Sequence, residues 1–269
     1  ETGRTLMGFV PLFGLDAAPS AGDRAAGPLT GLWFLVFVMP MFLLTPDVPA
    51  TGASLREAAG RGVRTLLGTI AHARRHGPVM RFLLANMVYQ DGLVALFAFG
   101  GIYAAGVFGW GTIEIGVFGI LLTITGTIGA FVGGRLDDAV GSKPVILGAL
   151  GILIACCIGI LSLSSDRILF VVPVEPPQPG DGLYASLPEQ VYLGLGLLIG
   201  LVAGPMQAAS RSLLVRLAPE GRAGEFFGLF ALSGKVTSFL APTMVAIATQ
   251  ASGTQTAGLA VLVLFFGTG

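Results

Sequence analysis

The feature that most constrains this chain is a series of long apolar runs that contain almost no charged residues. A helix needs roughly 20 apolar residues to cross a bilayer core about 30 Å thick. The runs lie at 28–46, 81–105, 112–134, 144–163, 191–214 and 226–249, and a shorter one begins at 256 and ends with the sequence at Gly269. Charged residues make up only 11% of the chain, against about a quarter in soluble domains. The pattern predicts an all-α integral membrane protein whose partner is the lipid bilayer.

Charge balance and residue spacing exclude several other classes of protein. The 15 basic and 15 acidic residues cancel, with no basic tail, which argues against nucleic-acid binding. The two cysteines, Cys156 and Cys157, are adjacent in an apolar run. Neighbours on a helix point about 100° apart, so we expect neither a disulfide nor a metal site. The sequence shows no nucleophile triad, phosphate-binding loop or metal-ligand spacing, and we therefore expect no enzyme and no cofactor.

Basic residues gather in alternate loops between the predicted spans. Lys and Arg accumulate in short cytoplasmic loops, and eleven of the 15 basic residues fall in the segments 47–81, 135–143 and 211–222. This distribution places 47–80 in the cytoplasm as a basic linker, with an amphipathic helical pattern over 63–70. We expect a multi-pass protein of the bacterial plasma membrane, with this linker on the cytoplasmic side.

Two opposite charges lie at membrane depth. Asp91 falls about 15 Å beyond Arg81, and Lys235 about 13 Å beyond Phe226, at 1.5 Å per helical residue. An ionisable side chain in the bilayer costs several kcal/mol unless it is paired or hydrated, so each is a functional candidate. The matching depths suggest one shared pocket. A second interpretation remains open, in which the two residues form a structural ion pair that joins two helices.

Further polar groups accompany these charges on the same predicted helices. Asn86, Tyr89 and Gln90 precede Asp91 at spacings that share one helix face. Gln207 lies beside Pro205, which predicts a helix kink, and Ser238 follows Lys235 closely. The candidate substrate-binding or coupling residues are therefore Asn86, Tyr89, Gln90, Asp91, Gln207, Lys235 and Ser238.

Small residues and uncharged runs predict how the helices are arranged. The glycines at 196, 200 and 204, and those at 126, 129 and 133, form stripes that allow close helix packing. The runs at 28–46, 144–163 and 256–269 have no charged side chain at membrane depth, and we expect them on the outside of the bundle. Among the six helices after the linker, the first, fourth and fifth are polar. This distribution favours a three-plus-three arrangement around a cavity, as in transporters.

The stretch from Gly134 to Lys143 resembles the cytoplasmic loop signature of major facilitator transporters, Gly-x-Leu-x-Asp-Arg-x-Gly-Arg-Lys. Gly134, Leu136, Asp138, Gly141 and Lys143 match, whereas alanine and serine stand at 139 and 142, where the family commonly has arginines. The resemblance implies a conformational-switch loop formed by Gly134, Asp138, Gly141 and Lys143. The departures weaken a charge-relay role and leave Asp138 as the partner of a helix N-terminus or a nearby arginine.

Other segments narrow the resemblance to one branch of this superfamily. They are Tyr89-Gln90-Asp91-Gly92, Gln207 with Ser210-Arg211-Ser212, and the Glu225-Phe226-Phe227-Gly228 and Ser233-Gly234-Lys235 stretches. They look like the branch that contains the fungal autophagy-linked vacuolar amino-acid effluxer and its bacterial relatives, over about 80–250. The resemblance implies a major facilitator fold, of which this chain holds a C-terminal six-helix lobe plus one preceding helix.

The resemblance also implies a division of the chain into four parts. We expect 1–27 to be the remnant of a preceding helix and external loop, and 28–46 to be the last helix of the N-terminal lobe. The segment 47–80 would be the cytoplasmic inter-lobe linker, and 81–269 the C-terminal lobe with its last helix truncated. The missing N-terminal lobe is then a partner of this chain.

The function implied is secondary active transport by alternating access. The substrate would be a small polar solute, with amino acids the first candidate through the resemblance alone, and protons are the candidate coupling ion because Asp91 is an intramembrane acid. The alternative is a non-transporting membrane scaffold or receptor in which Asp91 and Lys235 form a structural intramembrane ion pair.

Overall fold

The structure is a computed structural model that describes residues 21–46, 52, 54–174, 182–219 and 221–269. The chain divides into two units, Glu1–Ala58 and Ala59–Gly269. In the first unit, helix α1 (Ala21–Leu44) carries the first apolar run. Most of the expected remnant at 1–27 lies outside the described residues, so that prediction is not tested.

The second unit is a helical bundle that begins with most of the linker helix α2 (Leu55–Arg75). It continues with α3 (Gly77–Phe108), α4 (Thr112–Val140), α5 (Ser142–Leu161), α6 (Leu187–Leu217), α7 (Ala223–Val236), α8 (Leu240–Ser252) and α9 (Gln255–Thr268). Each predicted apolar run coincides with one of these helices, except that 226–249 is divided between α7 and α8. Within the described residues, six helical segments are long and apolar enough to cross a membrane, with α7 and α8 forming one of them and α9 shorter. The prediction of an all-α integral membrane protein is confirmed.

Glycines bring α4 and α6 into close contact, as their spacing predicts. A Cβ atom at Gly129 would overlap the backbone carbonyl of Leu201, and one at Gly133 would overlap Pro205. From the other side, a Cβ at Gly200 would overlap the Thr125 hydroxyl. Small residues let helix backbones approach where larger side chains would hold them apart. The pairing of α4 with α6 therefore depends on glycine at these positions.

The uncharged helices α5 and α9 are not simply peripheral. In α9, Leu262, Phe265 and Phe266 are buried, and a Cβ at Gly92 of α3 would lie against Phe265 and Phe266. In α5, Leu153 is fully buried. The expectation that these two runs lie on the outside is therefore too simple, because an apolar side chain suits a packed protein interior as well as it suits lipid.

One end of the bundle is closed by an aromatic cluster and a short hairpin. The Trp110 indole donates a hydrogen bond to Glu189 Oε1 at 2.8 Å, and the other oxygen of Glu189 accepts from Ser186 at the start of α6. The antiparallel strands β1 (Arg167–Ile168) and β2 (Val172–Pro173) form the hairpin.

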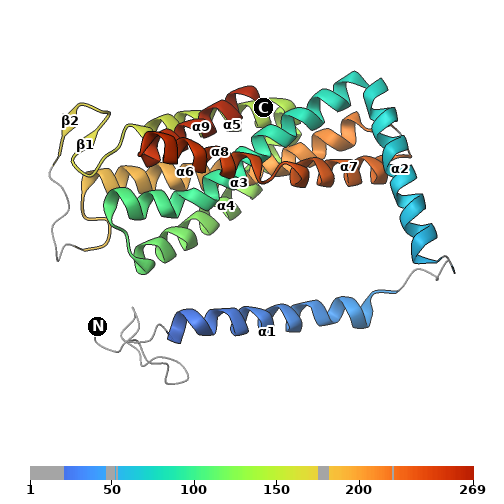
Figure 1. The fold of residues 1–269 in the computed structure, drawn as a ribbon, viewed down its shortest axis with the longest axis horizontal. Coiled ribbons are helices and arrows are strands. Elements are labelled where there is room, and N and C mark those ends of the chain that lie inside the picture. Colours follow the sequence, from blue (N-terminus) through green and yellow to red (C-terminus); the bar gives the residue numbers. More distant parts are fainter. Residues whose placement is uncertain (1–20, 47–51, 53, 175–181, 220) are drawn as a thin grey trace. The chain divides into compact units, whose positions relative to one another are not determined.

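At the other end, α2 crosses the bundle. From residue 59 onward its ribbon runs across the ends of α3 and α7, whereas the other helices of this unit run side by side (Figure 1). Its packed face contacts a second, smaller core that contains Val79, Leu83, Leu214 and Phe226. The amphipathic pattern over 63–70 therefore does form a helix, as the sequence predicts.

Candidate functional site

The candidate site centres on Asp91, near the middle of α3. Its side chain is 1% exposed, and neither carboxylate oxygen has a hydrogen-bond partner within the described part of the chain. The Thr237 side chain lies beside it, and the Thr237 hydroxyl is likewise buried with no hydrogen-bond partner among the described residues. Burying an unpaired carboxylate costs several kcal/mol. Asp91 is therefore a costly residue at this position, which is typical of a functional group.

Thr237 lies in an interruption between two helices. Helix α7 ends at Val236 and α8 begins at Leu240. Pro242 explains the break locally, because it has no N–H to donate to the carbonyl four residues earlier and its ring crowds that carbonyl. Within the break, Leu240 N–H donates to the Thr237 carbonyl at 2.7 Å and Ser238 Oγ donates to the Lys235 carbonyl at 3.0 Å. A broken helix thus lies opposite the buried acid.

Lys235 does not pair with Asp91. The Lys235 side chain is exposed, and none of the ion pairs among the described residues joins it to Asp91. The structural ion pair that the sequence leaves open is therefore not formed among the described residues, and the shared pocket stays a prediction. Helix α7 ends between the two residues, at Val236, so Lys235 and Thr237 do not share one helix face.

The other polar residues of α3 are turned into the protein. Gln90 is half-buried, and its Cγ lies 3.7 Å from the position that a Cβ would take on Gly234 of α7. Asn86 and Tyr89 are 2% and 1% exposed. The Tyr89 hydroxyl lies 2.7 Å from Ser210 Oγ, which itself donates to the Met206 carbonyl at 2.6 Å. In this conformation Tyr89 joins α3 to α6. Helical spacing does not identify Ser210 as its partner, because the two residues lie on different helices.

Gln207 lies in a separate open groove of about 780 Å³. The groove is lined by α3, α4 and α6, with Thr123, Thr127 and Gly204 among its residues. Asp91 is not among the described residues that line it. The structure therefore brings together Asp91, Gln90 and the α7–α8 break, and it places Gln207 in a second region.

In the segment predicted to be a switch loop, a different aspartate from the expected one is buried, and 134–140 form the last turns of α4. Asp138 is exposed, as are Gly134 and Lys143, whereas Asp137 is only 8% exposed and lies 3.8 Å from Arg216 Nη2. The prediction that Asp138 is the partner of an arginine is wrong for this structure. The buried face of α4 runs through Gly129, Gly133 and Asp137 at steps of four, which turns Asp137 rather than its neighbour toward α6.

Gly141 has a backbone conformation that favours glycine over residues with a side chain. It ends α4 with φ of 90°, a left-handed conformation that favours glycine. Its N–H donates to the Asp137 carbonyl at 3.0 Å. The match to the loop signature at this position therefore has a structural cause.

A bundle of long apolar helices with a buried carboxylate beside a broken helix defines an all-α integral membrane protein of the major facilitator type. The model of the family described as "Vacuole effluxer Atg22 like" matches residues 23–269. The chain belongs to this family.

Curated relatives of known name support the assignment. Autophagy-related protein 22-1 of Penicillium rubens is 26% identical over 236 residues, covering 84% of this chain and 38% of the relative. Autophagy-related protein 22 of Cryptococcus neoformans is 24% identical over 261 residues, covering 91% of this chain and 42% of the relative. The chain thus spans about two fifths of the length of these relatives. No solved structure matches it.

Proposed function

We propose that this chain is part of a secondary active transporter that moves a small polar solute, with amino acids as the first candidate. The family's description as an effluxer supports transport. The observation that carries the proposal is the buried, unpaired Asp91 carboxylate opposite the α7–α8 break. In a static helical scaffold a buried, unpaired carboxylate only lowers stability. In a transporter the free energy of such a group can differ between the two conformations and so couple to the change between them.

The proposed mechanism is alternating access with proton coupling through Asp91. In the conformation described, the Asp91 side chain is buried, with 1% of its surface exposed. Movement of α8 relative to α7 at the break would hydrate this group and release the proton. Thr237, Ser238 and Gln90 line the moving region, and we assign substrate contacts to them, with Asn86, Tyr89, Gln207 and Lys235 joining as the two lobes rock.

The proposed organisation follows from the length of the relatives. Helix α1 would end an N-terminal lobe, 47–80 would link the lobes, and 81–269 would form the C-terminal lobe, with the missing lobe completing the pathway. We place 47–80 on the cytoplasmic side. The curated relatives reported above are fungal, so they do not support the bacterial plasma membrane expected from the sequence.

The alternative, a non-transporting scaffold held by a structural intramembrane ion pair, lacks its key feature. It requires Asp91 and Lys235 to be paired, and within the described residues they are not. We therefore favour the transporter.

The test is amino-acid uptake into proteoliposomes by the full-length protein, with and without an imposed pH gradient. Asp91→Asn should abolish the response to the gradient while leaving counterflow exchange measurable, because the amide cannot release a proton. Asp166→Asn is the matched control, since Asp166 is an exposed acid in the hairpin. Gradient-driven uptake that is unchanged in Asp91→Asn would show the coupling proposal to be wrong, and absence of any uptake by the wild type would remove the transporter proposal itself.

A further inference from the structure

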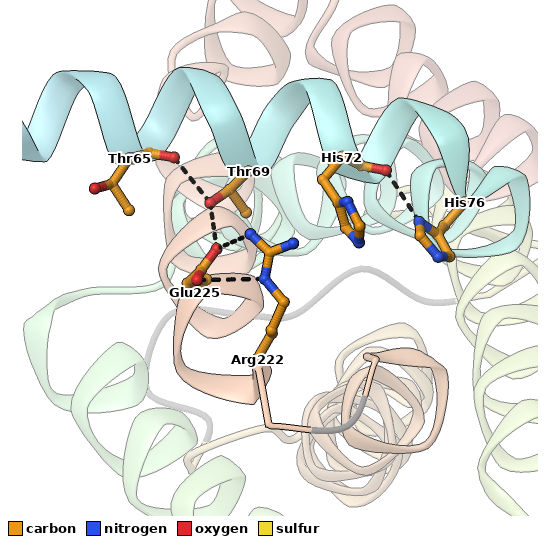
Figure 2. A network of polar contacts seen from close by, with 6 residues as sticks. All are labelled: Thr65, Thr69, His72, His76, Arg222 and Glu225. Atoms are coloured by element: carbon orange, nitrogen blue, oxygen red, sulfur yellow. Dashed lines mark hydrogen bonds and ion pairs between the residues drawn. The ribbon is translucent and has the colours of Figure 1, made fainter.

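The linker helix α2 has a face that is firmly docked. Leu66, Thr69, Ile70 and Ala73 recur at helical spacing and are buried or half-buried, and the apolar ones among them pack against the second core with Phe226 of α7. Figure 2 shows the polar contacts that accompany this packing. Thr69 Oγ1 donates to Glu225 Oε2 at 2.8 Å.

A fixed acid–base pair holds this contact in place. Arg222 donates to both oxygens of Glu225, at 2.6 Å from Nη2 and 3.3 Å from Nε (Figure 2). A two-point contact of this kind fixes the carboxylate geometrically, and the carboxylate in turn holds Thr69. The rotation of α2 about its own axis is therefore determined, and so is the face that it turns outward.

The outward face combines apolar and basic side chains. At 100° per residue, Leu67 lies about 160° around the helix from Thr69, and Arg64 and Arg74 lie about 140° away on either side. Leu67 and Val63 are 61% and 58% exposed. We call Val63, Arg64, Leu67 and Arg74 the outer face of α2. The apolar and basic residues share this face, because Arg74 falls at an angle between Val63 and Leu67 and Arg64 falls about 60° beyond Leu67. Basic and apolar side chains together are typical of helices that lie in a membrane interface.

The charge on this part of α2 is unbalanced. Residues 59–75 include four arginines and no acidic residue. Within the described residues, Arg61, Arg64 and Arg74 make no ion pair. Each exposed guanidinium is therefore available to an anion, and arginine is suited to two-point binding of phosphate.

Helix α2 runs across the end of the bundle and not alongside the other helices of this unit (Figure 1). Those helices include the candidate membrane spans. The ends of membrane spans lie at the level of the lipid headgroups. The cytoplasmic leaflet carries the anionic lipids.

We propose that the outer face of α2 is a binding site for anionic lipid headgroups, with Arg64 and Arg74 contacting phosphate and Val63 and Leu67 entering the boundary with the acyl chains. The Thr69–Glu225 contact connects this lipid site to α7, the helix that ends at the break opposite Asp91. The inference does not depend on transport activity, but it rests on the proposed placement of 47–80 on the cytoplasmic side.

The first experiment measures the depth of Leu67. A spin label is placed by Leu67→Cys in the full-length protein, with the buried Cys156 and Cys157 replaced by alanine. Reconstitution compares pure phosphatidylcholine with an equal mixture of phosphatidylcholine and phosphatidylglycerol. We expect high collision with oxygen and low collision with a water-soluble nickel chelate in the mixed vesicles. High collision with the nickel chelate would place the face in water, and low collision with both would place it under protein; either result overturns the proposal.

The second experiment counts bound lipid. Phosphatidylglycerol retained by the protein on extraction from the mixed bilayer is compared for the wild type, Arg64→Gln/Arg74→Gln and the matched control Arg135→Gln/Arg167→Gln, which removes two exposed arginines outside α2. An interfacial arginine contributes about fivefold in affinity for an anionic membrane, so we expect the α2 variant to bind about 25-fold more weakly. Equal losses in both double variants would show a general charge effect and overturn the site.

Discussion

The Tyr89 hydroxyl and the Ser210 hydroxyl lie 2.7 Å apart between α3 and α6, and both side chains are at most 1% exposed. Ser210 has one hydroxyl proton, which it donates to the Met206 carbonyl, so the Tyr89 hydroxyl is the donor in the pair. This direction makes the two side chains unequal in their effect on stability.

We predict that Ser210→Ala destabilises the protein more than Tyr89→Phe. Tyr89→Phe leaves Ser210 hydrogen-bonded to the Met206 carbonyl and should lower stability by about 0.5–1.5 kcal/mol. Ser210→Ala leaves the buried Tyr89 hydroxyl without an acceptor and should lower stability by about 1–3 kcal/mol. Thermal unfolding in detergent micelles measures both. Thr123→Val is the control, since its exposed hydroxyl bonds only to its own helix. The reverse order would show that Tyr89 accepts the bond.

The second prediction concerns the contact between α4 and α6. Gly129→Ala places a methyl group onto the Leu201 carbonyl, and because backbone cannot move aside cheaply, we expect a loss of about 1–3 kcal/mol. Gly116→Ala in the same helix meets nothing within 4 Å and should leave the unfolding temperature unchanged or raise it slightly. If Gly129→Ala left the unfolding temperature unchanged, α4 and α6 would be further apart than described.

The two neighbouring aspartates of the switch loop should behave differently. Asp137→Asn removes the ion pair with Arg216, which is 51% exposed, so the effect on stability is about 1 kcal/mol or less and should weaken with added salt. Asp138→Asn, at an exposed position, should have no effect on stability. The unfolding temperatures of the two variants, measured at low and at high salt, distinguish the two effects. A larger effect at Asp138 would restore the sequence-based assignment.

The contact between α2 and α7 makes a further prediction. Glu225→Gln weakens the bonds to Arg222 and Thr69. A net loss of about 1 kcal/mol corresponds to about fivefold faster amide hydrogen exchange in 66–75 of α2. Exchange measured by mass spectrometry on the full-length protein tests it. Glu114→Gln serves as the control because Glu114 caps α4, away from the linker. Equal exchange in wild type and Glu225→Gln would mean that the apolar contacts alone hold α2.

Several features could be predicted from the sequence because their causes are local. The spans follow from the length of the apolar runs, and the glycine stripes at 129, 133 and 200 follow from helical periodicity. The break after Val236 follows from Pro242, and the docked face of α2 from its amphipathic pattern. None of these needs knowledge of a distant residue.

The rest was decided by contacts between helices. Which of Asp137 and Asp138 is buried depends on how α4 is rotated against α6, and a shift of one residue is 100° of rotation. The side chain beside Asp91 is that of Thr237 and not that of Lys235, because α7 ends at Val236 and the chain is no longer helical at Thr237. Uncharged helices suit lipid and core equally well, so the burial of α9 against α3 is set by the packing of Phe265 and Phe266 on Gly92. Residue type and periodicity determined the helices and their polar faces, and only the tertiary structure decided which faces meet.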